Sequence, residues 1–283
     1  MDHVTDPKAL TPVEKHGDVW VKRDDKFIVG GVPGGKVRTC WHLAQGAKGL
    51  VTAGSRSSPQ VNIVAHIAQK LGIPCRVHTP EGELSPEVLA AKAAGAEVVQ
   101  HRAGYNSVII SRAREDAKRL GWADIPFGMD CWEAVQQTRG QAANLPREAK
   151  RIVIPVGSAM SLSGLLHGLL DIGWDVPVLG VVVGADPNDR LGKYAPITND
   201  YSSMWEEADS DVMVNIRDTH WKDMVTLVRS PLDYHQPYKD PYWRGIALDP
   251  IYEAKSIPFI EPGDLFWVIG VRQTFMQPDK MND

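Results

Sequence analysis

The segment RIVIPVGSAMSLSGLLHGLLDIG, residues 151–173, decides the fold class. It begins with a nearly continuous apolar run, residues 151–156, which is typical of a strand that is buried on both faces. A loop of small and hydroxyl residues follows, and after it the apolar spacing of residues 161–173 is that of a helix. A strand, a tight loop and a helix in this order predict one unit of a parallel α/β sheet.

The same alternation of strand and helix patterns continues on both sides of this segment. Short apolar runs predict strands at 49–54, 74–80, 96–101, 125–129, 177–187 and 264–270. Helical spacing and capping residues predict helices at 59–72, 85–96, 106–121, 131–145 and 248–257. Ligands of such α/β proteins bind beyond the carboxyl ends of the strands. We therefore expect a functional site in the loops that follow the strands.

Between residues 186 and 247 the pattern breaks down, with tryptophans among acidic residues and prolines. A single helix near 217–229 is predicted there. The segment is consistent with a lid, with a substrate-specific insert or with plain surface irregularity.

The composition excludes several classes of protein. The 283 residues are 43% hydrophobic and 23% charged, which is ordinary for a globular protein and argues against a disordered or coiled-coil chain. The net charge of −4 gives no bulk basicity for binding nucleic acid or an anionic membrane. No apolar run approaches the ~18 residues of a membrane helix, and the first residues lack the apolar stretch of a signal peptide. We therefore expect a cytoplasmic, enzyme-sized protein.

Neither a metal site nor a carboxylate pair is indicated. The three cysteines lack CxxC spacing, and the nine histidines form no HExxH or other paired spacing. His66 and His167 lie within predicted helices, where packing or surface positions are commoner than ligand positions. Asp24 and Asp25 are neighbours on a predicted strand and point to opposite faces, so joint acid–base catalysis is not expected.

Two loops that follow predicted strands are rich in small and hydroxyl residues. Loop 156–164 contains Gly157, Ser158, Ala159, Met160 and Ser161. Backbone N–H groups at a helix N-terminus favour anions, so this loop is consistent with a phosphate site and equally with a tight structural turn. Loop 53–60 contains Ser55, Ser57 and Ser58 before Pro59, and it is consistent with a carboxylate site or with a helix cap.

A third stretch, VWVKRDDKFIVGGVPGGKVR at 19–38, places Lys36 directly after a Gly-Gly turn. A lysine in a close, partly buried position loses hydration, which lowers its pKa and frees the amine to form a Schiff base. Most lysines are instead solvated surface charges, so this pattern alone leaves both interpretations open.

Taken in order, these stretches resemble the fold type II pyridoxal-phosphate enzymes, the group of tryptophan synthase β. The resemblance is strongest to the branch of aminocyclopropane-carboxylate deaminase and D-cysteine desulfhydrase. That branch has a Thr-Pro before K-R-D-D, then G-G-N-K-x-R, a G-G-x-x-S-N-H loop, a G-S-G-G-T-x-x-G loop and a D-P-V-Y-x-x-K helix. The matching positions are Thr11-Pro12, Lys22 to Asp25, Gly34 to Arg38, Gly54 to Gln60, Gly157 to Gly164 and Asp249 to Lys255.

The resemblance covers about residues 11–270 and implies the fold. We expect an α/β protein of two domains with open parallel sheets, tryptophan synthase β-like. The large cofactor-binding domain would comprise residues 1–44 and 126–283. A small α/β domain, residues 45–125, would be inserted in it, with the cofactor in the cleft between them.

The resemblance also implies roles for individual residues. Lys36 would hold the cofactor, pyridoxal 5'-phosphate, as an internal aldimine and would then move the α-proton of the substrate. Ser58 and Tyr252 would act beside it at the reactive face, although packing explains Tyr252 equally well. The implied cofactor-binding residues are Lys36, Gly157, Ser158, Ala159, Met160, Ser161 and Gln60. The implied substrate-binding residues are Ser55, Ser57, Ser58 and Gln60.

Three positions depart from the pattern of the family. Gly35 and Pro59 stand where the family has asparagines. Pro59 cannot donate a hydrogen bond to the phenolic oxygen of the cofactor, so Gln60 or Asn62 is expected to replace it. Ile269 falls near the position that faces the pyridine nitrogen. An apolar neighbour there would favour β-elimination or β-replacement, in which a leaving group drains the charge.

The favoured function is a pyridoxal-phosphate-dependent lyase or deaminase that acts on a small amino acid by α-proton abstraction and β-elimination. β-Replacement is one alternative, and action on an aminoacyl group carried by a nucleotide or nucleic acid is another. A third alternative is a non-catalytic binding protein that retains the fold. The resemblance implies a homodimer, and no membrane partner is expected.

Overall fold

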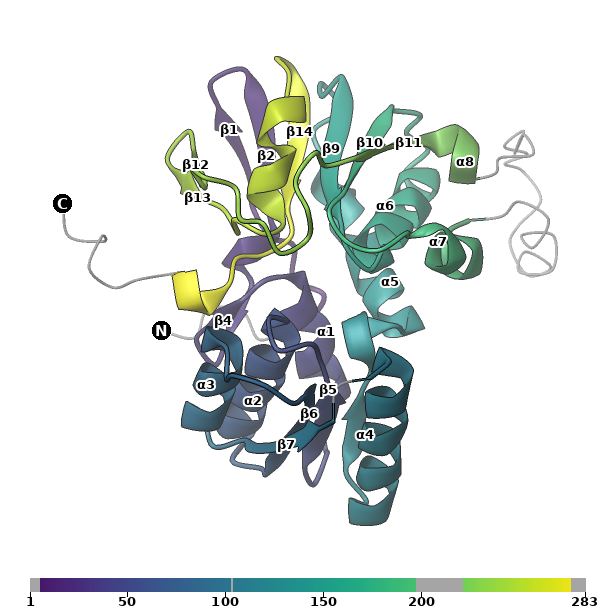
Figure 1. The fold of residues 1–283 in the computed structure, drawn as a ribbon. Helices are drawn as coiled ribbons and strands as arrows, with labels where there is room; N and C mark the ends of the chain where they lie inside the picture. Colours follow the sequence, from purple (N-terminus) through teal and green to yellow (C-terminus); the bar gives the residue numbers. More distant parts are fainter. Residues whose placement is uncertain (1–5, 103, 197–220, 276–283) are drawn as a thin grey trace, which may run out of the picture.

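The computed structural model describes residues 6–102, 104–196 and 221–275. Figure 1 shows two α/β halves stacked one above the other, each built around its own sheet. The upper half holds a six-stranded sheet and the lower half a four-stranded sheet. The two open sheets confirm the predicted α/β class.

The larger sheet has the strand order β1-β2-β14-β9-β10-β11. β1 (Val13–His16) pairs antiparallel with β2 (Val19–Arg23), and the other neighbouring pairs are parallel. The remaining strands are β14 (Asp264–Val268), β9 (Arg151–Val156), β10 (Val178–Val182) and β11 (Val225–Arg229). Because β14 lies between β2 and β9, the late strand of the chain is held beside the N-terminal segment.

The smaller sheet has the order β7-β6-β5-β8, and its strands are all parallel. They are β5 (Leu50–Ala53), β6 (Cys75–Pro80), β7 (Glu97–His101) and β8 (Ala123–Ile125). These strands fall within residues 45–125, the segment expected to form the small domain. The domain boundaries themselves stay a prediction.

Helices connect the strands in the manner of βαβ units. They are α1 (Gly35–Leu43), α2 (Pro59–Leu71), α3 (Pro86–Ala93), α4 (Asn106–Leu120), α5 (Trp132–Gly140), α6 (Met160–Asp171), α7 (Asn188–Tyr194) and α8 (Trp221–Met224). Two short hairpins join β3 (Ile28–Val29) to β4 (Val32–Pro33) and β12 (Tyr242–Trp243) to β13 (Ile246–Ala247). Short 3-10 segments include η2 (Phe127–Met129), η3 (Gln141–Asn144), η5 (Glu253–Phe259) and η6 (Gln273–Phe275).

The smaller sheet is buried on both faces, as its apolar strands predict. Leu50 on β5 packs in the hydrophobic cluster that contains residues of α1 and α2. Its neighbour Val51 points the other way and packs against Ile109 and Ala113 of α4. Successive residues of a strand face opposite sides, so one strand fills two cores.

Two glycines bring α5 and α6 close together. A Cβ on Gly164 would lie 2.6 Å from the carbonyl oxygen of Val135, and a Cβ on Gly168 would lie 2.6 Å from that of Arg139. Real Cβ atoms do not approach backbone so closely, and these positions therefore require glycine. The close packing fixes the direction of α6, whose N-terminus begins at loop 156–164.

Several sequence-based expectations were wrong. The strand expected at 125–129 lies earlier, since β8 ends at Ile125 and residues 127–129 form η2. Asp24 and Asp25, expected on a strand, lie in a short 3-10 segment, Asp24–Lys26.

Residues 248–257 do not form an α-helix; the chain turns and then forms η5, which contains Pro258 and cannot continue as a regular helix. Residues 225–229, expected to continue a helix from residue 217, form strand β11 instead and pair with β10. The first part of that expected helix lies outside the described residues.

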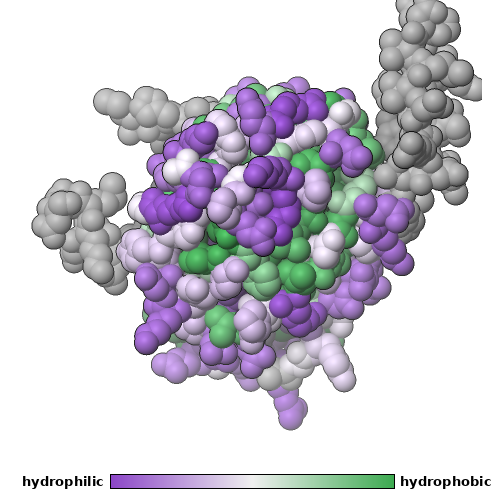
Figure 2. Space-filling view, turned by 90° about the horizontal axis from the view of Figure 1, so that it is seen from above, coloured by the Kyte–Doolittle hydropathy of each residue, from purple (hydrophilic) through white to green (hydrophobic). Residues whose placement is uncertain are grey.

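Most residues on the face seen in Figure 2 are polar. Figure 2 shows the end that carries the larger sheet, where hydrophilic residues surround a small apolar area near the middle. Within the described ranges, no helix is long and apolar enough to cross a membrane.

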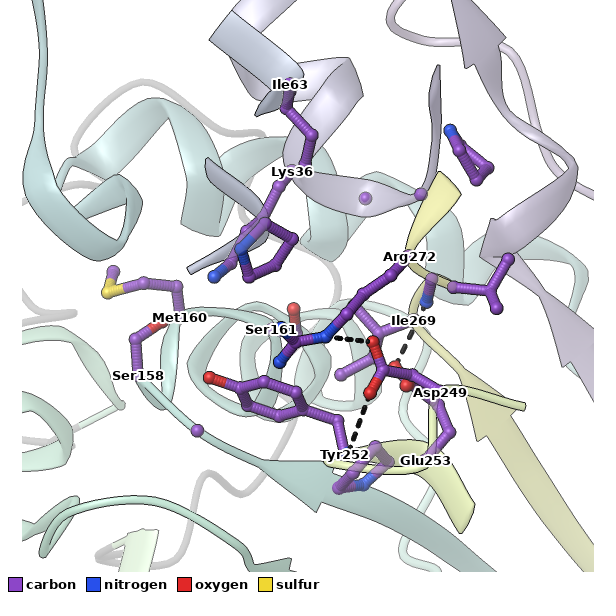
Figure 3. Close-up of a pocket in the computed structure, with 18 of the residues that line it drawn as sticks. Lys36, Ile63, Ser158, Met160, Ser161, Asp249, Tyr252, Glu253, Ile269 and Arg272 are labelled. Carbon is purple, nitrogen blue, oxygen red and sulfur yellow. Dashed lines mark hydrogen bonds and ion pairs between the residues drawn. The ribbon is translucent and has the colours of Figure 1, made fainter. Parts of the chain in front are cut away.

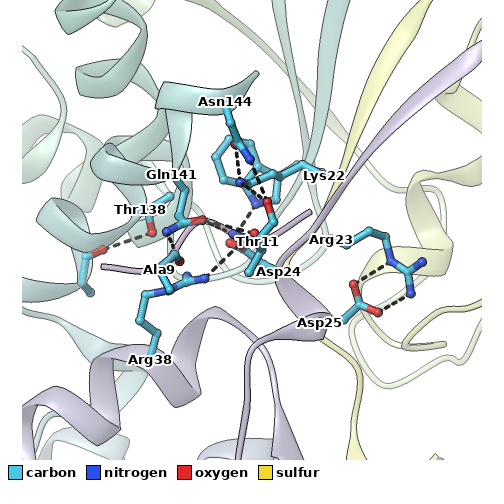
Figure 4. A network of polar contacts seen from close by, with 12 residues as sticks. Ala9, Thr11, Lys22, Arg23, Asp24, Asp25, Arg38, Thr138, Gln141 and Asn144 are labelled. Carbon is cyan, nitrogen blue, oxygen red and sulfur yellow. Dashed lines mark hydrogen bonds and ion pairs between the residues drawn. The ribbon is translucent and has the colours of Figure 1, made fainter. Parts of the chain in front are cut away.

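The K-R-D-D motif lies at the centre of a buried polar network (Figure 4). The Asp24 carboxylate accepts hydrogen bonds from Thr11 Oγ1 at 2.6 Å and from Trp267 Nε1 at 3.0 Å. Arg38 Nη2 lies 3.3 Å from the same carboxylate. These donors come from the N-terminal segment, from β14 and from α1, so one carboxylate joins three parts of the chain.

The lysine of the motif is equally buried. Lys22 Nζ donates to the Thr11 carbonyl at 2.9 Å and to Asn144 Oδ1 at 2.7 Å. Burial lowers the pKa of Lys22 to about 8. Arg23 and Asp25 form a separate two-point ion pair, with nitrogen–oxygen distances of 2.9 and 2.7 Å. These bonds give the motif a structural role, and the expectation that its aspartates do not act as a catalytic pair stays a prediction.

Replacing Asp24 with alanine should lower the free energy of unfolding by about 3–5 kcal/mol, because Arg38 and Lys22 would keep their burial and lose their carboxylate. Chemical denaturation measures this change. The matched control is Asp171→Asn, which removes an exposed carboxylate that pairs with Arg139 and should cost less than ~1 kcal/mol. Equal losses in the two variants would contradict the central place of Asp24.

Candidate active site

A cavity lies between the two halves, at the carboxyl ends of β9 and β14 and at the start of α1, α2 and α6 (Figure 3). It draws on segments far apart in the sequence. Its lining consists of Pro33, Gly34, Gly35, Lys36, Pro59, Ile63, Pro155, Gly157, Ser158, Ala159, Met160, Ser161, Leu162, Asp249, Tyr252, Glu253, Ile269, Gly270, Val271 and Arg272.

Lys36 is held at the cavity by the Gly-Gly turn before it. The backbone N–H of Gly35 donates to the carbonyl of Ile269 at 2.8 Å. Gly34 has a φ of 116°, and a Cβ there would lie 3.0 Å from the Cα of Gly270. Only glycine combines this backbone angle with so close an approach. The turn thus locks the start of α1 against the end of β14 and directs Lys36 into the cavity.

The Lys36 amine is surrounded by groups that favour its neutral form. Its side chain is only partly accessible, because it lies inside the cavity. Desolvation, followed by the positive charge of Arg272, lowers the pKa of Lys36 to about 8. Glu253 acts in the opposite direction, as does Asp249, while Arg190 lowers the pKa further. A lysine with such a pKa supplies a substantial fraction of nucleophilic amine near neutral pH.

Loop 157–161 forms the opposite wall. Ala159 has a φ of 63°, in the left-handed region that non-glycine residues rarely adopt, and it caps the N-terminus of α6. The Ser158 hydroxyl donates to the Gly128 carbonyl at 3.0 Å and so anchors the loop. A Cβ on Gly157 would lie 2.6 Å from Cε1 of Tyr252, so the aromatic ring packs directly on the loop backbone. The free backbone N–H groups at this helix start favour an anion.

Glu253 contributes a buried acid to the cavity. Desolvation and then the charge of Asp249 raise the pKa of Glu253 well above its usual value, which favours the protonated carboxyl group. Its Oε1 accepts from the Gly270 backbone N–H at 3.2 Å. Its Oε2 is buried and has no hydrogen-bond partner in the described part of the chain. A protonated carboxyl group in this position can donate a hydrogen bond to a ligand in the cavity.

Tyr252 and Arg272 complete the arrangement. The Tyr252 hydroxyl lies 2.8 Å from that of Tyr234, and burial raises its pKa well above 10. Arg272 Nε donates to Asp249 Oδ2 at 2.8 Å, and its guanidinium lies over the Tyr252 ring at 5.7 Å. The cavity therefore holds an amine, an acid, a guanidinium and a phenol within one enclosure.

The structure brings together most of the residues that the sequence analysis singled out. Those that line the cavity are Lys36, Gly157, Ser158, Ala159, Met160, Ser161 and Tyr252. Those that are not among its lining residues are Ser55, Ser57, Ser58 and Gln60.

Gln60 is fully occupied by other bonds. Its amide nitrogen donates to Thr52 Oγ1 at 2.9 Å and to the Pro126 carbonyl at 2.8 Å, and its oxygen accepts from the Gly128 N–H at 2.8 Å. In this arrangement Gln60 does not reach the cavity, and it instead ties α2 to the segment after β8. Ser58 Oγ accepts from the Gln60 N–H and caps α2.

Three cavity residues were missed by the sequence analysis as functional groups: Asp249, Glu253 and Arg272. Asp249 and Tyr252 were matched to the family motif, and Glu253 follows directly in the chain. The position of Glu253 directly after Tyr252 was the signal in the sequence that could have identified it. Arg272 follows the end of β14 by a few residues, and only the fold places it against Tyr252. Among the described residues, no cluster of three or more histidine, cysteine or acidic side chains is placed to hold a metal ion.

Lys36 should react as a free amine with a midpoint near pH 8. Labelling with acetic anhydride at different pH values, followed by peptide mass spectrometry, measures this midpoint against that of exposed lysines, which have a usual pKa of about 10.4. Between pH 8 and about pH 10.4, the Lys36 amine is protonated more often in the unfolded chain than in the folded chain. The free energy of unfolding should therefore increase as the pH rises through this range.

The variant Arg272→Gln should move the midpoint of Lys36 to higher pH, because the neighbouring cation is removed. A midpoint near that of exposed lysines in the unaltered protein would contradict the burial of the amine.

Comparison with known proteins supports this geometry. The rat "Serine dehydratase-like" protein is 30% identical over 179 residues, which are 58% of this chain and 50% of that protein. The chain thus spans about half the length of that relative. D-cysteine desulfhydrase of Klebsiella pneumoniae is 25% identical over 281 residues, which are 85% of this chain and 79% of that enzyme.

A solved structure described as an ACC deaminase homologue superposes with a TM-score of 0.73 at 22% identity. The superposition covers 96% of this chain and 93% of the other. It confirms the predicted fold, two open α/β sheets of the tryptophan synthase β-like, fold type II kind. The family model named "Pyridoxal-phosphate dependent enzyme" matches residues 7–220, most of the chain. The chain therefore belongs to the family of pyridoxal-phosphate-dependent enzymes.

Proposed function

We propose that this protein is a pyridoxal-phosphate-dependent lyase that releases ammonia from a small amino acid by α-proton abstraction and β-elimination. One observation carries the proposal: the Lys36 amine, with its pKa lowered to about 8, enters the same cavity as the N-terminus of α6. An activated amine opposite an anion-binding helix start suits a cofactor that carries both an aldehyde and a phosphate.

The side chains around the cavity fit this cofactor. Loop 157–161 would hold the phosphate through its backbone N–H groups, and Gly157 leaves the room that the Tyr252 ring fills. Glu253 Oε2 and Arg272 Nη2 are buried polar atoms without partners among the described residues, and such atoms normally have a ligand or water. When bound, pyridoxal phosphate supplies an electron sink for charge that develops at the α-carbon of an amino acid.

Residues of the chain would then bind the cofactor and move the protons of the reaction. Lys36 Nζ binds the cofactor and takes the proton from the α-carbon of the substrate. Glu253, whose pKa is raised by burial and whose Oε2 has no partner among the described residues, would hold a proton there and offer it as a hydrogen bond to the cofactor, beside the apolar side chain of Ile269. Tyr252 packs on the phosphate loop and excludes water from the ring. The hydrogen bonds of Gln60 position loop 53–60, whose residues Ser55, Ser57 and Ser58 do not line the cavity, so their binding of the substrate stays a prediction.

The relatives support elimination as the reaction type. Their printed names give serine and D-cysteine as substrates, and each of these amino acids has a leaving group on the β-carbon. β-Replacement stays as an outcome of the test below. The idea of a larger substrate rested on residues 186–247, and residues 197–220 lie outside the described part of the chain.

We also infer that the enzyme is cytoplasmic and works as a homodimer, as the family resemblance implies. The acidic net charge and the absence of bulk basicity support a free amino acid rather than a nucleic acid as its substrate. Light scattering during size exclusion tests the assembly.

The function is tested by incubating the cofactor-loaded protein with D- and L-serine, threonine and cysteine and measuring ammonia and 2-keto acid. We expect release of both products from at least one of these amino acids. Lys36→Ala should lose at least ~10³-fold in rate, because it removes the proton-transfer group. Lys118→Ala, which changes an exposed lysine of α4, should retain the rate.

The outcomes of this assay separate the alternatives. Consumption of substrate without keto acid, and only when a thiol is added, would indicate β-replacement. Full activity in Lys36→Ala, or no turnover and no cofactor uptake by the unaltered protein, would contradict the proposal.

Glu253→Ala should lower the elimination rate by about ten- to a hundredfold, because it removes a hydrogen-bond donor that faces the cavity. Glu253→Gln keeps an N–H donor at that position and should retain more of the rate. The comparison of the two variants in the same assay checks the role of Glu253. Equal losses in both would show that the ionisable carboxyl, rather than its hydrogen bond, is needed.

A further inference from the structure

Arg272 is a buried cation that lines the cavity. It is 5% exposed, and in Figure 3 its guanidinium lies in the cavity between Lys36 and Tyr252. Nε donates to Asp249 Oδ2, and Nη1 donates to the carbonyl of Ser57. These two bonds join the larger half to loop 53–60 of the smaller half, and they fix the orientation of the plane.

The third nitrogen of the Arg272 guanidinium, Nη2, is buried and makes no hydrogen bond to the described part of the chain. A guanidinium has five N–H donors in one plane and stays charged in proteins, so an unpartnered nitrogen is costly when it is shielded from water. A structural arginine would be satisfied by its neighbours. An acceptor from a ligand is therefore expected at Nη2.

The surroundings define the charge of that acceptor. The Arg272 guanidinium stays positively charged in proteins, and burial raises the pKa of the neighbouring Glu253, which favours the neutral form of that acid. Asp249 is already bonded to Arg272 through Nε, so the positively charged Nη2 edge that has no partner among the described residues favours an anionic acceptor. The backbone of Ser57, to which Arg272 is bonded, immediately precedes the N-terminus of α2, where the helix dipole also favours negative charge.

We propose that Arg272 binds a carboxylate of the substrate through Nη2. This inference rests on the proposed function, since it assumes an amino acid in the cavity. A planar guanidinium held at two of its edges presents its remaining edge with little loss of side-chain freedom, which suits the planar carboxylate group. The carboxylate has two sources, the α-carboxylate of any amino acid or the side chain of an acidic one.

Binding of unreactive amino acids tests the inference without measuring turnover. The cofactor-loaded protein is titrated with L- and D-alanine, with the corresponding alaninamides and with L- and D-aspartate, while the visible absorption band is followed. Alaninamide lacks the α-carboxylate, and aspartate adds a second carboxylate. The variants are Arg272→Gln and Arg272→Lys. Arg147→Gln, which changes an exposed arginine bonded to backbone carbonyls, is the matched control.

The unaltered protein and Arg147→Gln should bind one carboxylate-bearing probe about tenfold or more tightly than its matched partner. Preference for alanine over alaninamide assigns Arg272 to the α-carboxylate, and preference for aspartate over alanine assigns it to a side-chain carboxylate. In either case Arg272→Gln should load the cofactor and lose the preference. Arg272→Lys should lose part of it, because one ammonium cannot hold Asp249, Ser57 and the ligand together.

Two results would overturn the inference alone. One is an undiminished preference of Arg272→Gln for the carboxylate-bearing probe. If Arg272→Gln fails to load the cofactor, the same result in Arg272→Lys has this meaning. The other is a loaded, unaltered protein that shows no carboxylate preference. A protein that takes up no cofactor at all is distinguishable from both, and it would remove the proposed function together with this inference.

Discussion

The buried carboxylate of Asp24 is the interaction on which the site depends. It accepts from Thr11, Trp267 and Arg38, which belong to the N-terminal segment, to β14 and to α1. Lys36 lies two residues before Arg38 on the same helix, so the bonds that hold Arg38 also position the Lys36 backbone. The backbone bond from Gly35 to Ile269 closes the same junction from the other side. The K-R-D-D motif, which has a structural role, thus helps to determine where the Lys36 amine lies in the cavity.

Burial then sets the chemistry inside the cavity. The same desolvation lowers the pKa of the Lys36 amine and raises that of the Glu253 carboxyl group, so both shift toward their neutral forms. An amine and a carboxyl group that both favour their neutral forms are thereby held in one cavity. Environments that push two pKa values in opposite directions are a common property of acid–base sites.

The sequence was sufficient for the fold and for the part of the site that is local in the chain. Lys36 after its Gly-Gly turn and loop 157–161 after β9 could be predicted because each is a short strand–turn–helix unit. Ser58 and Gln60 are also in such a unit, yet whether a side chain faces a cavity or a neighbouring strand depends on contacts with Thr52 and Pro126 that no spacing reveals. The importance of Arg272 arises from a contact with Ser57, 215 residues away. A contact between residues so far apart in the sequence cannot be predicted from local sequence patterns.

The central claim is that Lys36 alone among the lysines carries the cofactor. The most direct measurement is to add pyridoxal phosphate, reduce the protein with borohydride, digest it and locate the retained phosphopyridoxyl group by mass spectrometry. We expect a stable modification, one per chain, on the peptide that contains Lys36, because among the described lysines this amine combines a lowered pKa with a place beside the helix start at loop 157–161. Modification spread over surface lysines, with none at Lys36, would contradict it.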